Sequence, residues 1–431
     1  MPLRLDRSSA DFEQRFAAFL AAKREVSADV ERATRAIVDD VVARGDAALI
    51  EATRKFDRLE LDASSLRVTA AEIDAAVKAC DAATVEALKF ARDRIETFHQ
   101  RQLPKDERFT DPLGVELGWR WSAVEAVGLY VPGGTAAYPS SVLMNAVPAK
   151  VAGVPRVVMV VPAPDGKLDP LVLAAAQLGG VSEIYRVGGA QAVAALAYGT
   201  ATIAPVAKIV GPGNAYVAAA KRLVFGKVGI DMIAGPSEVL VIADDTGNAD
   251  WIAADLLAQA EHDASAQSIL ITDSARLATD VERAVDAQLA TLPRAEIARA
   301  SWNDFGAIIL VKKLDDAVPL ANAIAAEHLE VMTADAEAFA AKVRNAGAIF
   351  IGAHTPEAIG DYVGGSNHVL PTARSARFSS GLGVLDFMKR TSILKCGPDQ
   401  LRALGPAAMT LGKAEGLDAH SRSVGLRLNL S

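Results

Sequence analysis

The spacing of apolar residues changes along the chain, from a helical repeat near the amino terminus to short apolar runs further on. From Ser8 to about Pro104, apolar residues recur at the three- and four-residue spacing of amphipathic helices. Thr69–Glu72 has the sequence of a capping box, which predicts a helix start, and Gly45 predicts a helix end. We therefore expect a mainly helical region over residues 1–110.

After a β-prone stretch at 115–124, apolar runs alternate with Ala-rich segments of helical composition. Short runs of aliphatic and β-branched residues predict strands that are buried on both faces. Strands of this kind that alternate with helices indicate a doubly wound parallel α/β fold. The runs that predict these strands are 156–161, 184–187, 239–242, 269–271 and 307–311.

A Gly- and Pro-rich stretch at 229–236 divides the alternating region into two halves of similar size. We interpret it as the crossing between two Rossmann-like domains, the first at 111–236 and the second at 237–380. The remaining residues, 381–431, form a tail that is expected to be helical from about Gly397. The predicted fold is thus two doubly wound domains with a helical region before them and a helical tail after them.

Composition narrows the class of protein. With 431 residues, of which 51% are hydrophobic, the chain can build large cores, but no apolar run is long enough to span a bilayer. The segment Met1–Asp11 is charged where a secretion signal is apolar, so we expect a cytoplasmic location. The net charge is −8 and the basic residues are scattered, which argues against nucleic acid or a membrane as partner. A small-molecule substrate is the expected partner.

Only two cysteines are present, Cys80 and Cys396, far apart in the sequence. Two cysteines are too few for a disulfide framework or for a Cys-rich metal site. Any metal must therefore be bound by nitrogen and oxygen ligands.

Three glycine-containing turns follow predicted strands, at 128–134, 187–191 and 210–214. Each turn can present backbone N–H groups and a helix N-terminus to an anion. The carboxyl ends of neighbouring strands are also where α/β sheets bind ligands. None of the turns has the G-x-G-x-x-G fingerprint, and tight turns without a ligand explain the glycines equally well. The spacing alone leaves the cofactor open.

Two pairs of polar residues end predicted helices. Gln259 and His262 lie on one face near the end of a helix that begins around Asn248, so both can bind one metal ion. The alternative is that His262 bonds the free carbonyls at the helix end. Glu327 and His328 lie at a helix-to-strand junction, where both can reach one cavity and serve two proton-transfer steps.

The other candidate residues are weaker on spacing alone. His99 lies in a polar helix end and is expected to be solvated, and His354 lies in a loop without an identifiable partner. Asp361 lies in a loop rich in glycine and polar residues, a composition more typical of a functional segment. For Glu415 and His420 in the tail, a solvated terminus is the simpler interpretation.

Together these segments resemble histidinol dehydrogenase over nearly the whole chain. The resemblance implies a zinc- and NAD-dependent enzyme that oxidises L-histidinol to L-histidine through the aldehyde, consuming two NAD in the last step of histidine biosynthesis. It also implies a homodimer in which the tail of one subunit completes the site of the other. The matching segments, in family order, are 130–134, 211–214, 260–263, 326–330, 364–372 and 415–420.

The resemblance also assigns roles to individual residues. Glu327 and His328 are the proton-transfer residues. One zinc ion per subunit is bound by four ligands, Gln259, His262, Asp361 and His420. The substrate is held by the metal ligands together with Ser237, His328 and Glu415. The NAD site is lined by Tyr130, Gln191 and Asn214.

Three other functions compete with this hypothesis. A paralogue can keep the zinc and NAD sites and oxidise another small alcohol. A zinc hydrolase can use Glu327 to activate water, with the glycine turns serving only the fold. A small-molecule binding protein without catalytic activity is the third.

Overall fold

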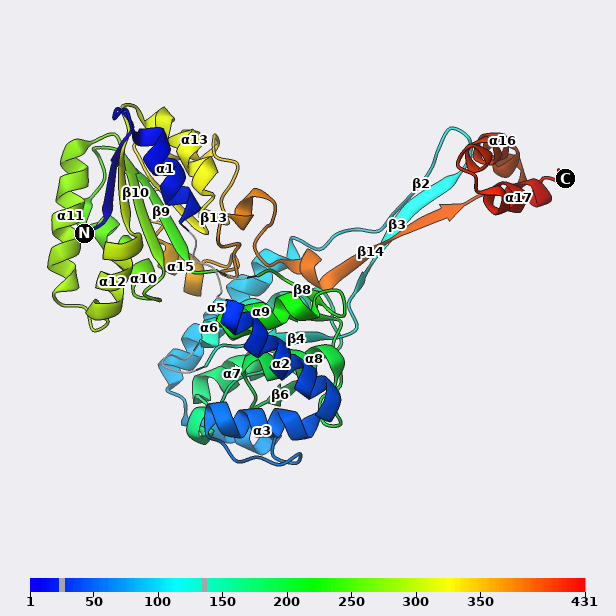
Figure 1. Ribbon diagram of the computed structural model, residues 1–431, viewed down its shortest axis with the longest axis horizontal. Coiled ribbons are helices and arrows are strands. Elements are labelled where there is room, and N and C mark those ends of the chain that lie inside the picture. The colour runs from blue at the N-terminus through cyan, green and yellow to red at the C-terminus, as the bar shows by residue number, and fades with distance from the viewer. Residues whose placement is uncertain (23–27, 134–137, 234, 431) are drawn as a thin grey trace.

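The computed structural model describes residues 1–22, 28–133, 138–233 and 235–430. Two parallel sheets, each enclosed by helices, form the body of the molecule, and a slender antiparallel arm projects from it (Figure 1). The α/β architecture with two doubly wound sheets is therefore as predicted. Among the described residues, no helix is both long enough and apolar enough to cross a membrane.

The larger sheet has six parallel strands in the order β1-β11-β10-β9-β12-β13. The apolar side chains of its strands are buried on both faces, because helices cover both sides of the sheet. The strands are β1 (Leu3–Asp6), β9 (Glu238–Ala243), β10 (Gln267–Thr272), β11 (Ala307–Leu310), β12 (His328–Met332) and β13 (Ala348–Ile351). One face is covered by α1 (Phe12–Ala21), α13 (Ala317–Ile324) and α14 (Ala336–Ala340). The other face is covered by α10 (Ala249–Ala260), α11 (Ala275–Leu289) and α12 (Ala295–Phe305).

The smaller sheet has five parallel strands in the order β6-β5-β4-β7-β8. They are β4 (Val127–Tyr130), β5 (Val157–Val160), β6 (Glu183–Tyr185), β7 (Lys208–Val210) and β8 (Gly229–Ile230). One face packs against α6 (Pro139–Val151) and α7 (Pro170–Gly179). The other packs against α8 (Gly189–Tyr198) and α9 (Ala215–Val224).

The helices of the amino-terminal region form a further layer on the smaller domain. Among them, α2 contacts α8 and α9, α4 contacts α7, and α5 contacts α6. They are α2 (Ala28–Arg44), α3 (Asp46–Asp57), α4 (Ala70–Ala79) and α5 (Ala82–Gln100). The predicted boundaries are confirmed: Gly45 follows α2 with a φ of 58°, and Thr69 and Glu72 form a capping box on α4.

The first strand was not expected, because residues 1–110 were predicted to be mainly helical. β1 instead pairs in parallel with β11, and Phe12 and Phe16 of α1 join the core of the larger sheet. The first 21 residues therefore lie with the larger domain, separated from α2 (Figure 1). A four-residue strand with a partner 304 positions away gives no local signal in the sequence. The positions of the predicted domain boundaries otherwise stay predictions.

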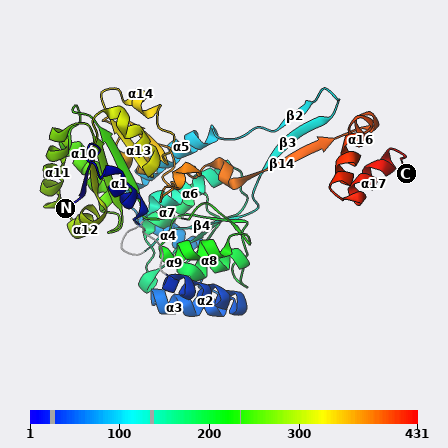
Figure 2. The same cartoon turned by 45° about the horizontal axis from the view of Figure 1, so that its top comes forward.

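The arm is a three-stranded antiparallel ribbon that ends in the helical tail. β14 (Met388–Lys395) pairs along its whole length with β3 (Glu116–Ala123), which also pairs with β2 (Glu107–Thr110). The tail consists of α16 (Pro398–Ala414) and α17 (Asp418–Arg427), which pack against each other. Figures 1 and 2 place this helix pair at the far end of the arm, away from both sheets.

The prediction for His99 was wrong. Its side chain is fully buried, and its Nδ1 lies 2.7 Å from the carbonyl oxygen of Ile95. The loop after α15 (Glu357–Tyr362) covers this end of α5, and Asn367 Nδ2 lies 3.5 Å from His99 Nε2. Because the covering loop is more than 260 residues away in sequence, the helix end looks solvated when it is considered alone.

Candidate active site

Glu327 and His328 lie where α13 gives way to β12, as predicted. Ala325 ends the helix in the left-handed conformation, with a φ of 49°, a conformation that costs a non-glycine residue roughly 1 kcal/mol. This turn directs both side chains to the amino end of β12, where His328 is in register with Val239. The site therefore lies at the amino edge of the larger sheet, the edge opposite to the usual ligand site of such sheets.

His328 is buried and surrounded by acceptors. Its Nδ1 lies 3.2 Å from the carbonyl oxygen of Glu238 and 3.6 Å from Glu357 Oε2, and its Nε2 lies 3.6 Å from Asp361 Oδ1. A carbonyl oxygen only accepts, so Nδ1 carries the hydrogen in this contact. The neutral ring thus presents Nε2 as the nitrogen that can take a proton.

The charges around His328 decide its protonation. Burial lowers the pKa of the imidazole, but the carboxylates of Glu327, Glu357 and Asp361 outweigh burial and raise that pKa well above its ordinary value. Burial likewise raises the pKa of Asp361, but the hydrogen bond and positive charge of His328 outweigh it and leave the pKa lowered. These two shifts therefore favour the charged pair of an imidazolium at His328 and a carboxylate at Asp361.

Glu327 is held by the main chain of the neighbouring strand. Its Oε2 accepts a hydrogen bond of 3.1 Å from the N–H of Glu238 and lies 3.9 Å from His328 Nδ1. Burial raises the pKa of Glu327 to about 7. A carboxylate that titrates near neutral pH can act as a general base under physiological conditions.

Three further carboxyl groups, those of Asp255, Glu330 and Glu357, form a connected cluster with Glu357 next to His328. None of them was predicted from the sequence. The N–H of Glu357 donates a hydrogen bond of 2.6 Å to Glu330 Oε1, and Glu330 also hydrogen-bonds Asp255. Burial raises the pKa of Glu357 to about 8 and that of Asp255 to about 6. The available signal was Glu330, an acidic residue in a buried apolar run, two residues after His328 and so on the same face of the strand.

The predicted metal ligands are brought together only in part. Gln259 lies at the end of α10, is 1% exposed, and its Oε1 has no hydrogen-bond partner among the described residues. His262 follows two residues after the helix and is close enough to Asp361 to interact electrostatically, and α10 contacts α15. Within the described part of one chain, no cluster of three His, Cys, Asp or Glu side chains encloses a metal position.

The remaining predicted ligand and one substrate residue are distant from this edge. His420 lies in α17 and Glu415 caps α16, and both are exposed in the tail at the end of the arm (Figure 2). Ser237 immediately precedes β9 at the amino edge of the sheet, and its carbonyl oxygen accepts a hydrogen bond from the N–H of Gln267. Within one chain, the predicted site at the amino edge of the larger sheet therefore lacks His420 and Glu415.

His368, to which the sequence analysis gave no role, connects the two domains at this site. Its Nδ1 lies 2.9 Å from the carbonyl oxygen of Asp361, and its Nε2 lies 3.1 Å from Ser141 Oγ in the first turn of α6. The ring therefore fixes the main chain of Asp361 against the smaller domain. The signal that could have identified it is its place in the glycine-rich polar loop.

The three glycine turns follow β4, β6 and β7 of the smaller sheet, although 134–137 lie outside the described residues. The buried Tyr130 hydroxyl accepts a hydrogen bond of 2.9 Å from the N–H of Gly189, which links two of the turns. Gln191 is buried in the first turn of α8. Asn214 is exposed, and its Oδ1 caps α9, so its side-chain N–H₂ group takes no part in the cap.

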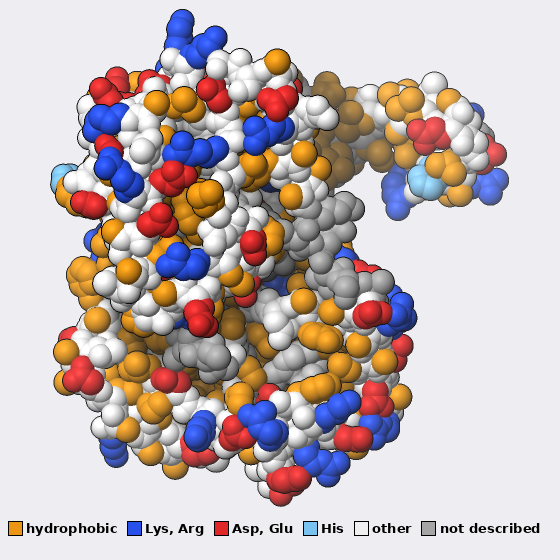
Figure 3. Space-filling model, turned by 60° about the vertical axis from the view of Figure 1, so that its left-hand side comes forward, with side chains coloured by type: hydrophobic (Ala, Val, Ile, Leu, Met, Phe, Trp, Pro, Cys, Tyr) orange, Lys and Arg blue, Asp and Glu red, His pale blue; other side chains and the backbone are white. Residues whose placement is uncertain are grey.

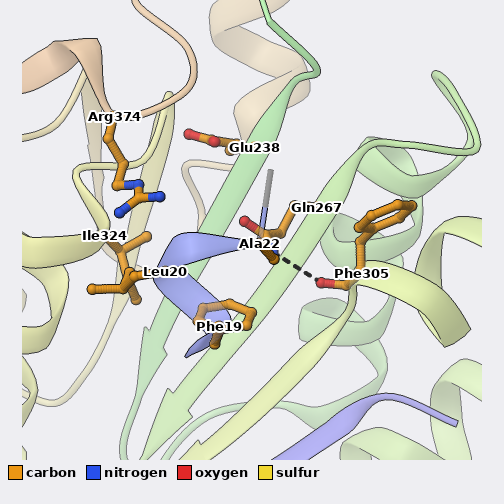
Figure 4. Close-up of a pocket in the computed structure, with 8 residues that line it drawn as sticks. All are labelled: Phe19, Leu20, Ala22, Glu238, Gln267, Phe305, Ile324 and Arg374. Carbon is orange, nitrogen blue, oxygen red and sulfur yellow. Dashed lines mark hydrogen bonds between the residues drawn. The ribbon is translucent and has the colours of Figure 1, made fainter. Parts of the chain in front are cut away.

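A small pocket adjoins Glu238 on the larger domain (Figure 4). None of the predicted metal ligands lines it, but Glu238, whose backbone contacts Glu327 and His328, does. Its lining residues are Phe19, Leu20, Ala22, Glu238, Gln267, Phe305, Ile324 and Arg374.

On the face shown in Figure 3, basic and acidic side chains are interspersed without a large region of one sign.

Comparison with known proteins gives a consistent result. The family model for histidinol dehydrogenase matches residues 20–428. Over its whole length the chain is 87% identical to histidinol dehydrogenase of Bradyrhizobium diazoefficiens and 83% identical to that of Rhodopseudomonas palustris, with all of each relative covered. The crystal structure of histidinol dehydrogenase from Elizabethkingia anophelis, 34% identical, has a TM-score of 0.94 and matches 99% of this chain and 98% of that one.

Two doubly wound sheets with a buried Glu-His pair at one edge define a two-domain α/β enzyme equipped for proton transfer. The sequence and structural matches make that enzyme a dehydrogenase acting on a small molecule. The chain belongs to the histidinol dehydrogenase family, and its function is the last step of histidine biosynthesis. The resemblance seen in the motifs is confirmed.

The buried carboxyl of Glu357 predicts a pH-dependent stability. Its folded-state pKa is raised to about 8, so its contribution to stability is present below its ordinary pKa and is lost as the pH rises through 8. Replacement Glu357→Gln removes this loss. We expect the free energy of unfolding of the variant, relative to wild type, to increase by on the order of 2 kcal/mol between pH 5 and pH 9.

Urea titrations followed by tryptophan fluorescence at several pH values measure this difference. The variant Glu337→Gln, at an exposed position, offers a matched control for the loss of one glutamate charge. If the free energies of unfolding of Glu357→Gln and wild type differ by a constant amount from pH 5 to pH 9, Glu357 does not titrate as described.

Proposed function

We propose that this dehydrogenase oxidises L-histidinol to L-histidine through the aldehyde, using two NAD and one zinc ion per subunit, in the cytoplasm. The observation that carries the proposal is the pairing of two buried bases, Glu327 and His328, on the backbone of Glu238. The family reaction removes two hydrides and adds one water molecule, and it therefore needs a base for the hydroxyl proton and a base for water.

His328 takes the hydroxyl proton at Nε2 in both oxidation steps. Its Nδ1–H is fixed on the Glu238 carbonyl, so Nε2 is the free basic atom. NAD accepts the hydride that leaves the same carbon atom. The carboxylates around the ring favour the imidazolium that forms, which makes proton removal easier.

Glu327 activates water for attack on the aldehyde. Oε2 is held by the N–H of Glu238, which leaves Oε1 for a water molecule. The product is the aldehyde hydrate, from which His328 removes a proton during the second hydride transfer. The thiol route is disfavoured, because Cys80 has a pKa raised by burial and Cys396 is exposed at the end of the arm.

Zinc is proposed to be bound by Gln259, His262 and Asp361 of one subunit and by His420 of the partner subunit. The unpartnered buried Oε1 of Gln259 supports this set, because a buried polar atom without a hydrogen bond is costly unless a ligand satisfies it. Oxygen and imidazole ligands without thiolate suit a site that stays open to further ligands. When bound, the metal would orient the substrate through its imidazole and amine groups.

The proposed homodimer explains the exposed tail. Leucine side chains on the arm and tail are strongly exposed, a pattern typical of a protein–protein contact surface. They are Leu394 (68%), Leu411 (63%), Leu417 (43%) and Leu426 (67%). In the proposed dimer, the tail delivers Glu415 and His420 to the substrate and metal of the other subunit, and Ser237 holds the substrate from the amino end of β9.

The proposed NAD site lies at the carboxyl edge of the smaller sheet, along Tyr130, Gln191 and Asn214. Three turns with helix N-termini at that edge support it, since such turns present N–H groups to phosphates. His368 and Ser141 hold the two domains together between this edge and the bases.

Family membership disfavours the hydrolase and binding-protein alternatives. A paralogue acting on another alcohol is likewise not favoured.

The stoichiometry of the reaction tests the proposal most directly. We expect two NADH to be formed for each L-histidinol consumed, measured by absorbance together with amino-acid analysis. Treatment with a chelator should abolish turnover, and added zinc should restore it. One NADH per substrate, or faster reaction with another amino alcohol or polyol, would contradict the proposed reaction.

The roles of His328 and Glu327 in the two oxidation steps should be distinguishable by kinetics. We expect His328→Asn to reduce both oxidations by about 10²–10⁴-fold, since it removes the base common to both steps. Glu327→Gln should reduce oxidation of the aldehyde by a similar factor and leave the alcohol step nearly intact. Stopped-flow assays started with alcohol or with aldehyde measure the two steps, and Glu337→Gln serves as a control at an exposed glutamate.

The aldehyde step should also depend on pH in the direction set by Glu327. The carboxylate is the active form, so the rate of this step should fall as the pH drops below about 7. Equal losses with alcohol and aldehyde in the Glu327→Gln variant would contradict the proposed division of roles.

The shared site predicts complementation between subunits. His262→Ala and His420→Ala should each be inactive as homodimers. Mixed dimers should regain up to about half the activity, because one of their two sites has a complete ligand set. Activity assays on dimers purified with two different affinity tags measure this, and no recovery in confirmed mixed dimers would exclude a shared site.

A further inference from the structure

A buried ion pair lies beneath the third glycine turn. Lys221 of α9 and Asp231, which follows β8, form a salt bridge in which the side chains are 2% and 1% exposed. Taking two charges out of water costs several kcal/mol per ion, and apolar residues of similar volume often stabilise a core as well or better. General packing between α9 and the sheet therefore does not explain these charges.

Both partners of the ion pair also bind the backbone of one residue, Gly211. Lys221 Nζ donates a hydrogen bond of 3.0 Å to the carbonyl oxygen of Gly211. Asp231 Oδ2 accepts a hydrogen bond of 2.7 Å from the N–H of Gly211. The ion pair thus satisfies both backbone polar groups of Gly211 at the point where the chain leaves β7.

Gly211 is the residue at which the turn takes its shape. Its φ is 105°, and an added Cβ would lie 2.2 Å from the carbonyl oxygen of Tyr130. Three residues later, Asn214 starts α9 by accepting hydrogen bonds from Tyr216 and Val217. Because Lys221 belongs to that helix, it ties the body of α9 back to the beginning of the turn.

We infer that Lys221 and Asp231 are positioning residues that hold the Gly211–Asn214 turn in the conformation that binds the dinucleotide. The inference rests on the NAD site proposed above. It goes beyond that proposal because it assigns control of the dinucleotide affinity to two side chains that do not face the dinucleotide. Displacing a binding turn by about 1 Å is enough to weaken a site substantially.

The test compares cofactor and substrate parameters in the full-length protein. For Lys221→Met and for Asp231→Asn we expect the Kd for NADH, from its fluorescence, and the KM for NAD to rise about tenfold. The kcat and the KM for L-histidinol should stay within about twofold, because Glu327, His328 and three of the proposed metal ligands lie on the larger domain and the fourth, His420, lies in the tail. The control Arg222→Gln removes a neighbouring exposed ion pair with Glu31 and should change none of these values.

The outcomes separate the inference from the proposal on which it rests. If wild type neither binds NADH nor reduces NAD, the proposed function fails. If wild type does both and a folded Asp231→Asn variant binds NADH with unchanged affinity, the positioning role is wrong. An equal loss in cofactor and substrate parameters, or failure of both variants to fold, would assign the pair to stability alone and also overturn the inference.

Discussion

The pairing of β12 with β9 is the constraint on which the candidate site depends. Its register sets His328 opposite Val239, and this brings the N–H and carbonyl of Glu238 against the two bases. A shift of one residue would turn the side chain of His328 to the other face of the sheet. The positions of Glu327 and His328 therefore rest on backbone hydrogen bonds, which are more rigid than side-chain contacts.

This arrangement has a cost in stability. Glu330 and Glu357 are buried beside His328, and burial raises the pKa of both, so each opposes folding once it is ionised. The apolar cores on both faces of the larger sheet offset that cost. Buried acids packed beside a proposed catalytic base are typical of a site in which stability is given up for function.

The sequence predicts most of what is local and little of what depends on distant partners. The strands around 157–160 and 238–243, the capping box at Thr69 and the helix start at Asn248 are confirmed, because each is specified by neighbouring residues. β1 and the burial of His99 were missed, because their partners are hundreds of residues away. For the same reason spacing alone left Gln259 and His262 ambiguous, and only the resemblance to a family assigned them roles.

The edges of the two sheets explain why the functional residues are so scattered in sequence. The bases lie at the amino edge of the larger sheet, whereas the glycine turns lie at the carboxyl edge of the smaller one. In the proposed reaction, a hydride can pass from substrate to cofactor only if the amino edge of the larger sheet and the carboxyl edge of the smaller sheet are held close together. His368, bonded to Asp361 on one side and to Ser141 on the other, is a contact that holds them, so the glycine-rich loop that carries it serves both domains at once.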